Sequence, residues 1–121
     1  MTPVLLTPIS RRIYNTEVNP VVVEDNLADI RRGAIDAATA SKTTLVHLNE
    51  RSAAYLNAIG SKDAYTHNLS PMDYTHLHIE GSRVFRRLMG KLLLEAMPSL
   101  AGYVAVPSTL NTDLDKGIYY Y

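Results

Sequence analysis

The sequence lacks cysteine, which excludes disulfide bonds, thiolate metal sites and a cysteine nucleophile. It also lacks a net charge, because twelve Lys and Arg residues balance twelve Asp and Glu residues, so no net field draws the chain toward nucleic acid or an acidic membrane surface. No apolar run reaches membrane-spanning length, and the first residues lack the basic and long apolar regions of a signal peptide. As written, the sequence predicts a cytosolic protein without a nucleic-acid or membrane partner.

The chain does contain the material of one globular unit. Of its 121 residues, 46% are hydrophobic and 20% are charged, close to the averages of ordinary domains. We therefore expect a single unit with enough apolar surface to form a core.

The first half of the sequence predicts a strand followed by a helix. The apolar run Val4–Thr7 lies between prolines, a pattern typical of a strand buried on both faces. A polar loop over residues 10–20 leads to Asn26, the expected helix N-cap, with Asp29 as its capping-box partner. The apolar positions that follow have helical spacing, so this face should lie on a sheet; they are Leu27, Ile30, Ala34, Ile35 and Ala38.

The second half predicts another strand and two more helices. Residues 44–48 form a β-branched and aliphatic run in which we expect His47 to be a hydrogen-bonded core imidazole. Asn49 should cap a helix over residues 50–59, which Gly60 ends. After a loop over residues 61–77, a third helix is expected over residues 80–97, with Pro98 as its stop and an apolar stripe of Val84, Phe85, Leu88, Met89, Leu92 and Leu93.

This order of elements indicates a βαβ unit with parallel strands and a right-handed crossover. Two parallel strands do not form a sheet that stands alone, and residues 101–121 contain Pro107, Gly117 and no strong period. We therefore expect residues 1–100 to be the C-terminal part of a larger α/β sandwich and residues 101–121 to be a tail. An exposed strand edge would favour self-association or pairing with another segment.

The segment over residues 71–77 carries the main chemical signal. It places Asp73 and His76 three residues apart, just before the third helix. Asp73 can accept a hydrogen bond from one ring nitrogen of His76, while the other nitrogen takes a proton from a nucleophile. No plausible activated serine accompanies the pair, so the sequence indicates a class of reaction more readily than an active enzyme.

Other interpretations of these residues remain open. Asp73 can be a loop residue that caps a turn, and His76 can be a surface histidine. His76 and His78 can form a metal pair with Asp73 as the third ligand, although such a pair needs strand geometry or a further ligand, and we expect no metal and a solvated His78. Arg11 and Arg12 follow the first strand, where loops line the ligand crevice of a parallel sheet, so they can bind substrate or form a solvated basic pair.

Three segments together resemble the C-terminal half of an SGNH (GDSL-type) hydrolase, and most closely the rhamnogalacturonan acetylesterase branch of the carbohydrate esterases. Residues 3–12 resemble the family's fourth strand and the loop after it, and residues 48–60 resemble the strand end and helix before the last catalytic loop. Residues 65–77, followed by Gly81 and Phe85, resemble the final block with its Asp-x-x-His. The resemblance covers roughly residues 3–100.

The resemblance implies a flavodoxin-like three-layer α/β/α sandwich, here with an incomplete parallel sheet, and serine ester hydrolysis without a cofactor. A serine would attack an acetyl carbonyl, with His76 as base and then acid and Asp73 as its orienting carboxylate. Implied substrates are an acetylated polysaccharide or a small ester, and Arg11 and Arg12 would contact uronate carboxylates of a pectic backbone. Complete members of the family are extracellular.

The sequence departs from the family in three segments. It contains neither the Gly-Asp-Ser segment with the nucleophile nor the two blocks that supply the oxyanion-hole Gly and Asn, and residues 60–61 and 81–82 are only superficial Gly-Ser matches. We therefore expect this chain alone to be close to inert. It would be a fragment or truncated product of an ester hydrolase, a non-catalytic binding or interaction remnant, or a subunit complemented by another that carries the serine.

Two minor features depend on export or on the tail. Residues 68–70 form an N-glycosylation sequon, weakened by the proline that follows and meaningful only in an exported protein. Tyr119, Tyr120 and Tyr121 can dock a sugar ring or form a frayed terminus.

Overall fold

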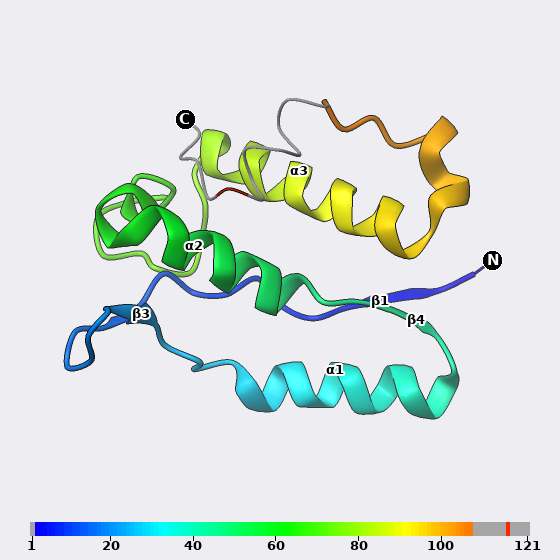
Figure 1. The fold of residues 1–121 in the computed structure, drawn as a ribbon, viewed down its shortest axis with the longest axis horizontal. Coiled ribbons are helices and arrows are strands. Elements are labelled where there is room, and N and C mark those ends of the chain that lie inside the picture. Colours follow the sequence, from blue (N-terminus) through cyan, green and yellow to red (C-terminus); the bar gives the residue numbers. More distant parts are fainter. Residues whose placement is uncertain (1, 108–115, 117–121) are drawn as a thin grey trace.

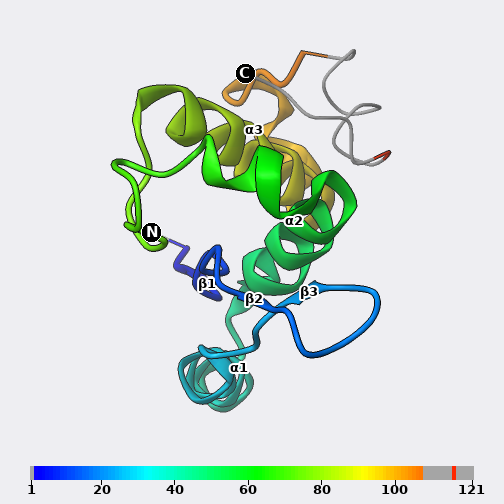
Figure 2. The same cartoon turned by 90° about the vertical axis from the view of Figure 1, so that its left-hand side faces the viewer.

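The computed structural model describes residues 2–107 and 116 as a mixed α/β fold with a small parallel sheet. Helix α1 (Ala28–Ser41) lies on one side of this sheet, and α2 (Leu48–Tyr65) and α3 (Ile79–Ala96) lie on the other (Figures 1 and 2). A 3₁₀ turn, η1 (Pro98–Gly102), follows α3. None of the helices over residues 2–107 is long and apolar enough to cross a bilayer. Tyr119–Tyr121 lie outside the described residues.

The parallel strand pair is the one that the sequence predicts. Strand β1 (Val4–Leu6) pairs with β4 (Thr44–Val46), with Leu5 opposite Leu45, and α1 forms the crossover between them. A second pair, β2 (Tyr14–Asn15) with β3 (Val22–Val23), is antiparallel and was not expected. Strands of two residues are too short to show a period in the sequence.

Burial of β1 differs from the prediction. Val4 and Leu5 are only half-buried and Leu6 is 41% exposed, so the expectation of a strand buried on both faces is wrong for the described part of the chain. Only β4 neighbours β1 in this sheet, so its outer edge has no strand beside it over residues 2–107. In β4, by contrast, Val46 is buried between the helical layers.

Helix α1 lies on the sheet as predicted, but its start and its buried face differ. Leu27 is the N-cap and no side chain caps the helix, so the predicted role of Asn26 is wrong. Among the expected apolar positions Ala38 is buried, whereas Ile30 is 60% exposed. Leu27, Ala34 and Ile35 are half-buried, because a sheet of two strands covers only a narrow strip of the helix.

Helix α2 begins earlier and ends later than predicted. Gly60 has φ 79° and breaks the helical geometry, but helix resumes and continues to Tyr65, because the second part buries Ala64 completely. Asn49 is not the N-cap: it is buried, and its backbone N–H donates to Thr7 Oγ1 at 2.8 Å. His47 is not a core imidazole either, because its side chain is 52% exposed and pairs with Glu50 at 2.9 Å.

Helix α3 confirms its predicted range to within one residue at each end. Its apolar stripe packs against α2, where Tyr55 and Leu56 are also buried. Pro98 ends the helix by opening the 3₁₀ turn. The buried members of the stripe are Val84, Phe85, Leu88 and Leu92, and Met89 and Leu93 are partly buried beside them.

Candidate active site

The predicted site lies on the loop over residues 67–78, which connects α2 and α3. Figure 1 places this loop on the side of the molecule toward which β1 and β4 run. At its base the His78 amide donates to the His67 carbonyl at 3.2 Å, and the Leu69 amide donates to the His76 carbonyl at 3.0 Å. An antiparallel bridge between Asn68 and Leu77 joins the two sides. The loop is therefore closed at its base by backbone hydrogen bonds.

A tight turn over residues 70–73, at the tip of the loop, positions Asp73. The Asp73 amide donates to the Ser70 carbonyl at 3.1 Å, with Pro71 at the second position and Met72 at the third. Met72 has φ 68°, the left-handed value that the third position of a type II turn requires and that glycine usually supplies. The turn reverses the chain so that the Asp73 carboxylate faces the residues that follow it.

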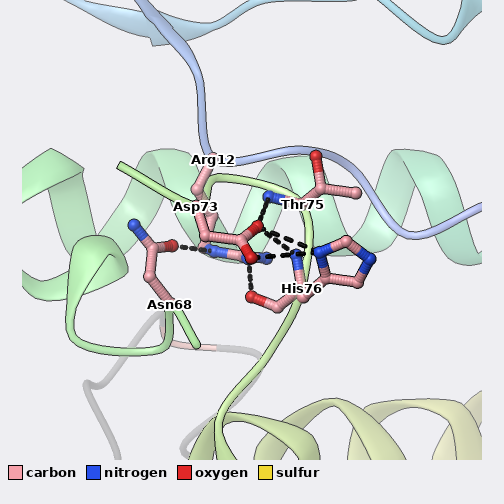
Figure 3. A network of polar contacts seen from close by, with 5 residues as sticks. All are labelled: Arg12, Asn68, Asp73, Thr75 and His76. Carbon is pink, nitrogen blue, oxygen red and sulfur yellow. Dashed lines mark hydrogen bonds and ion pairs between the residues drawn. The ribbon is translucent and has the colours of Figure 1, made fainter. Parts of the chain in front are cut away.

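Asp73 and His76 are in direct contact (Figure 3). His76 Nδ1 lies 3.0 Å from Asp73 Oδ2 and 3.2 Å from Oδ1. The same carboxylate accepts the His76 amide at 2.9 Å and the Thr75 amide at 3.1 Å. The hydrogen bond from the His76 amide, joined by those from the Thr75 amide and the imidazole, lowers the pKa of the Asp73 carboxyl below its usual value.

This geometry gives the two ring nitrogens different roles. An ionised carboxylate only accepts hydrogen bonds, so it fixes the His76 proton on Nδ1 and leaves Nε2 as an acceptor. Figure 3 shows Nε2 on the side of the ring away from Asp73. The His76 side chain is 72% exposed, and it lies with Arg11 along an open surface depression of about 580 Å³. The imidazole can therefore take a proton from a group that enters from outside this loop.

The structure separates Arg11 from Arg12. Arg11 is half-buried and lines the depression beside His76. Arg12 is 0% exposed, and its guanidinium donates to the Asn68 side chain and, at 2.7 Å, to the His76 carbonyl. It is neither a solvated residue nor available to a substrate in this structure. The sequence could not predict the burial of Arg12, because a buried arginine after a strand has the same local pattern as an exposed one.

The described residues also bear on the metal site, the role of His78, the sequon and the serine that the sequence analysis considered. No group of three His, Asp or Glu side chains there can hold a metal ion. His78 is not a free solvated residue, because its Nδ1 accepts the Gly81 amide at 2.8 Å and caps α3. Asn68 is buried and its amide oxygen accepts a hydrogen bond from Arg12, so the side chain of the sequon asparagine is not on the surface of the folded chain. Over residues 2–107, no serine hydroxyl hydrogen-bonds to His76.

Comparisons of this chain with family models, with curated proteins and with solved structures return no match.

Proposed function

We propose that this chain carries the acid–base pair of an SGNH-type ester hydrolase, of the rhamnogalacturonan acetylesterase kind, and represents the C-terminal part of that family's α/β/α sandwich. The observation that carries the proposal is the contact of His76 Nδ1 with both oxygens of Asp73, on a loop that follows a parallel βαβ unit. Helices on both sides of the strand pair support the proposed sandwich. The half-buried β1 supports further strands beside it.

The chemistry proposed is acyl transfer through a serine that another segment supplies. His76 Nε2 takes the serine proton as the oxygen attacks the ester carbonyl, and Asp73 stabilises the imidazolium that forms. The imidazolium then protonates the departing sugar oxygen as its bond to the acyl carbon breaks, so the sugar leaves with a hydroxyl and the serine carries the acetyl group. Water attacks that intermediate with His76 again as base, releasing acetate and restoring the serine. We propose acetyl esters of a pectic polysaccharide as the substrate class.

The test joins this chain to the N-terminal half of a rhamnogalacturonan acetylesterase that contains the Gly-Asp-Ser segment. Acetate release is measured for the fusion and for its His76→Ala variant. We expect the substitution to lower kcat by about 10⁴-fold or more, as for the loss of a triad histidine.

The chain provides a matched control at His47. Its imidazole is also exposed and also contacts a carboxylate three residues away, Glu50 at 2.9 Å, but it lies at the start of α2, outside the candidate site. His47→Ala should leave kcat unchanged. Equal rates for the fusion and for His76→Ala would refute the proposed role. A folded fusion that releases no acetate and does not label with a fluorophosphonate would favour a non-catalytic binding module instead.

A further inference from the structure

Arg12 connects two parts of the chain that are far apart in sequence. It lies in the segment after β1, whereas its side-chain acceptors are Asn68, 56 positions later, and His76, 64 positions later (Figure 3). Its own amide also donates to the Tyr74 carbonyl at 3.0 Å. One residue therefore binds both sides of the loop that carries the candidate site.

The hydrogen bonds around His76 hold the peptide groups on both of its sides. On the amino side, its N–H donates to Asp73. On the carboxyl side, its carbonyl accepts from the Leu69 amide at 3.0 Å and from Arg12 Nη2 at 2.7 Å. A carbonyl oxygen has two lone pairs, and both are used here. The direction in which the His76 side chain leaves the backbone is therefore fixed before any substrate binds.

Burying the Arg12 guanidinium costs free energy, so the hydrogen bonds that compensate for this cost must be well aligned. Desolvation lowers the pKa of the guanidinium, and the nearby Asp73 carboxylate opposes that shift. Arg12 Nη1 is buried and has no hydrogen-bond partner in the described part of the chain. The hydrogen bonds donated by Nε and Nη2 therefore compensate for the burial. Because their donor is charged, they are stronger than hydrogen bonds between neutral groups. The planar fork that reaches two acceptors at once is specific to arginine.

We propose that Arg12 is a positioning residue, which fixes the backbone from which His76 reaches Asp73. It touches no reacting atom and acts through the His76 carbonyl. Its catalytic meaning rests on the proposed function, but the positioning itself is a property of this chain and can be tested without turnover.

The experiment measures the protonation of the His76 ring by ¹⁵N NMR in the full chain, above neutral pH. In the unsubstituted chain, we expect one dominant tautomer with the proton on Nδ1. Arg12→Lys keeps the charge and the aliphatic stem but loses the fork, so the Nε2-protonated tautomer should appear as a second population. Arg32→Lys, at an exposed arginine of α1, should leave the His76 signals unchanged. The methyl signals of Leu56 and Val84 report whether the core is intact.

The outcomes separate positioning from general stability. A folded Arg12→Lys chain with an unchanged tautomer would overturn the proposal, even if its unfolding midpoint fell. If Arg12→Lys does not fold, a scalar coupling across the hydrogen bond between Arg12 Nη2 and the His76 carbonyl carbon, measured in the unsubstituted chain, decides the question, and its absence overturns the proposal.

The fused esterase distinguishes this proposal from the proposed function. There Arg12→Lys should lower kcat by between about 10-fold and about 100-fold with KM unchanged, because it misplaces the imidazole without touching the substrate. If His76→Ala leaves the rate unchanged, the proposed function fails while the NMR result still stands. If His76→Ala abolishes the rate and Arg12→Lys does not lower kcat, only the positioning role fails.

Discussion

Lowering the pH tests the burial of His67, the histidine at the base of the site loop. Its side chain is 1% exposed, stacks on the Tyr55 ring at a centroid distance of 6.2 Å, and meets the Phe85 ring edge-on at 5.9 Å. Burial lowers the pKa of His67 from its usual 6.5 to about 4, and the nearby His78 and Arg12 add to the shift. The folded protein therefore holds this imidazole in its neutral form.

The sign of the effect follows from where the proton binds. In the unfolded chain His67 takes up a proton near pH 6.5, whereas the folded chain resists protonation down to about pH 4. The stability contributed by the neutral, buried ring is complete above pH 6.5 and is lost as the pH falls through this window. The loss is about 1.4 kcal/mol per pH unit, or about 3 kcal/mol over the whole window, against the 5–15 kcal/mol of a typical domain. Asp73, whose pKa is lowered from 3.8, contributes only at more acidic pH.

The assay is urea unfolding followed by circular dichroism at several pH values between about 7.5 and about 4. His67→Gln should be less stable than the unsubstituted chain at neutral pH but much less sensitive to acid, because no proton binds at that position. His47→Gln, which removes an exposed imidazole, should keep the full pH dependence. Parallel pH profiles for the unsubstituted chain and His67→Gln would refute this reasoning.

Four further predictions concern stability and are checked by urea or thermal unfolding. Gly33→Ala, inside α1, should stabilise the fold by about 0.5–1 kcal/mol, because the added Cβ would meet nothing within 4 Å in the described residues beyond its chain neighbours and its own helix backbone; a loss of stability would contradict this. Gly60→Ala should destabilise it by about 1–3 kcal/mol because φ is 79°, although space is equally open there. Gly81→Ala should cost about 1–3 kcal/mol and displace the site loop, visible as shifted His76 NMR signals, because its Cβ would lie 2.7 Å from the His67 carbonyl oxygen. Leu56→Ala, at a fully buried position, should cost about 2–5 kcal/mol; less than about 1 kcal/mol would argue against the packing of α2 on α3.

The sequence predicted well the features that depend on residues close to one another along the chain. Helix α3 shows its apolar stripe at regular spacing and ends before a proline, so its range was predictable to within a residue. The contact between Asp73 and His76 was also predictable, because three residues on a turn keep two short side chains within reach. At Gly60 the break was predicted but the continuation of helix to Tyr65 was not, since that depends on the burial of Ala64 in a core formed by distant residues.

Predictions that depended on what a residue packs against were less successful. His47 looked like a core residue because it follows an apolar run, yet the strand ends at Val46 and leaves it outside. His78 looked solvated, yet it caps α3. Ile30 looked buried, yet it is 60% exposed on a helix that packs on a parallel sheet of only two strands in the described residues. His47 and His78 each contact a residue three positions further along the chain, Glu50 and Gly81, so the start of a helix decided both outcomes. The small extent of the sheet decided the exposure of Ile30.

The sequence by itself determined the amphipathic α3 and the adjacency of a carboxylate and an imidazole, because each follows from spacing along one short stretch of chain. It also determined the parallel βαβ unit, through the order of the two strands and the helix between them. The tertiary structure alone decided that Arg12 reaches the His76 carbonyl and that His67 is held neutral in the core. Both depend on bringing together residues that are tens of positions apart, and hydrogen-bond geometry and desolvation act only after that approach has been made.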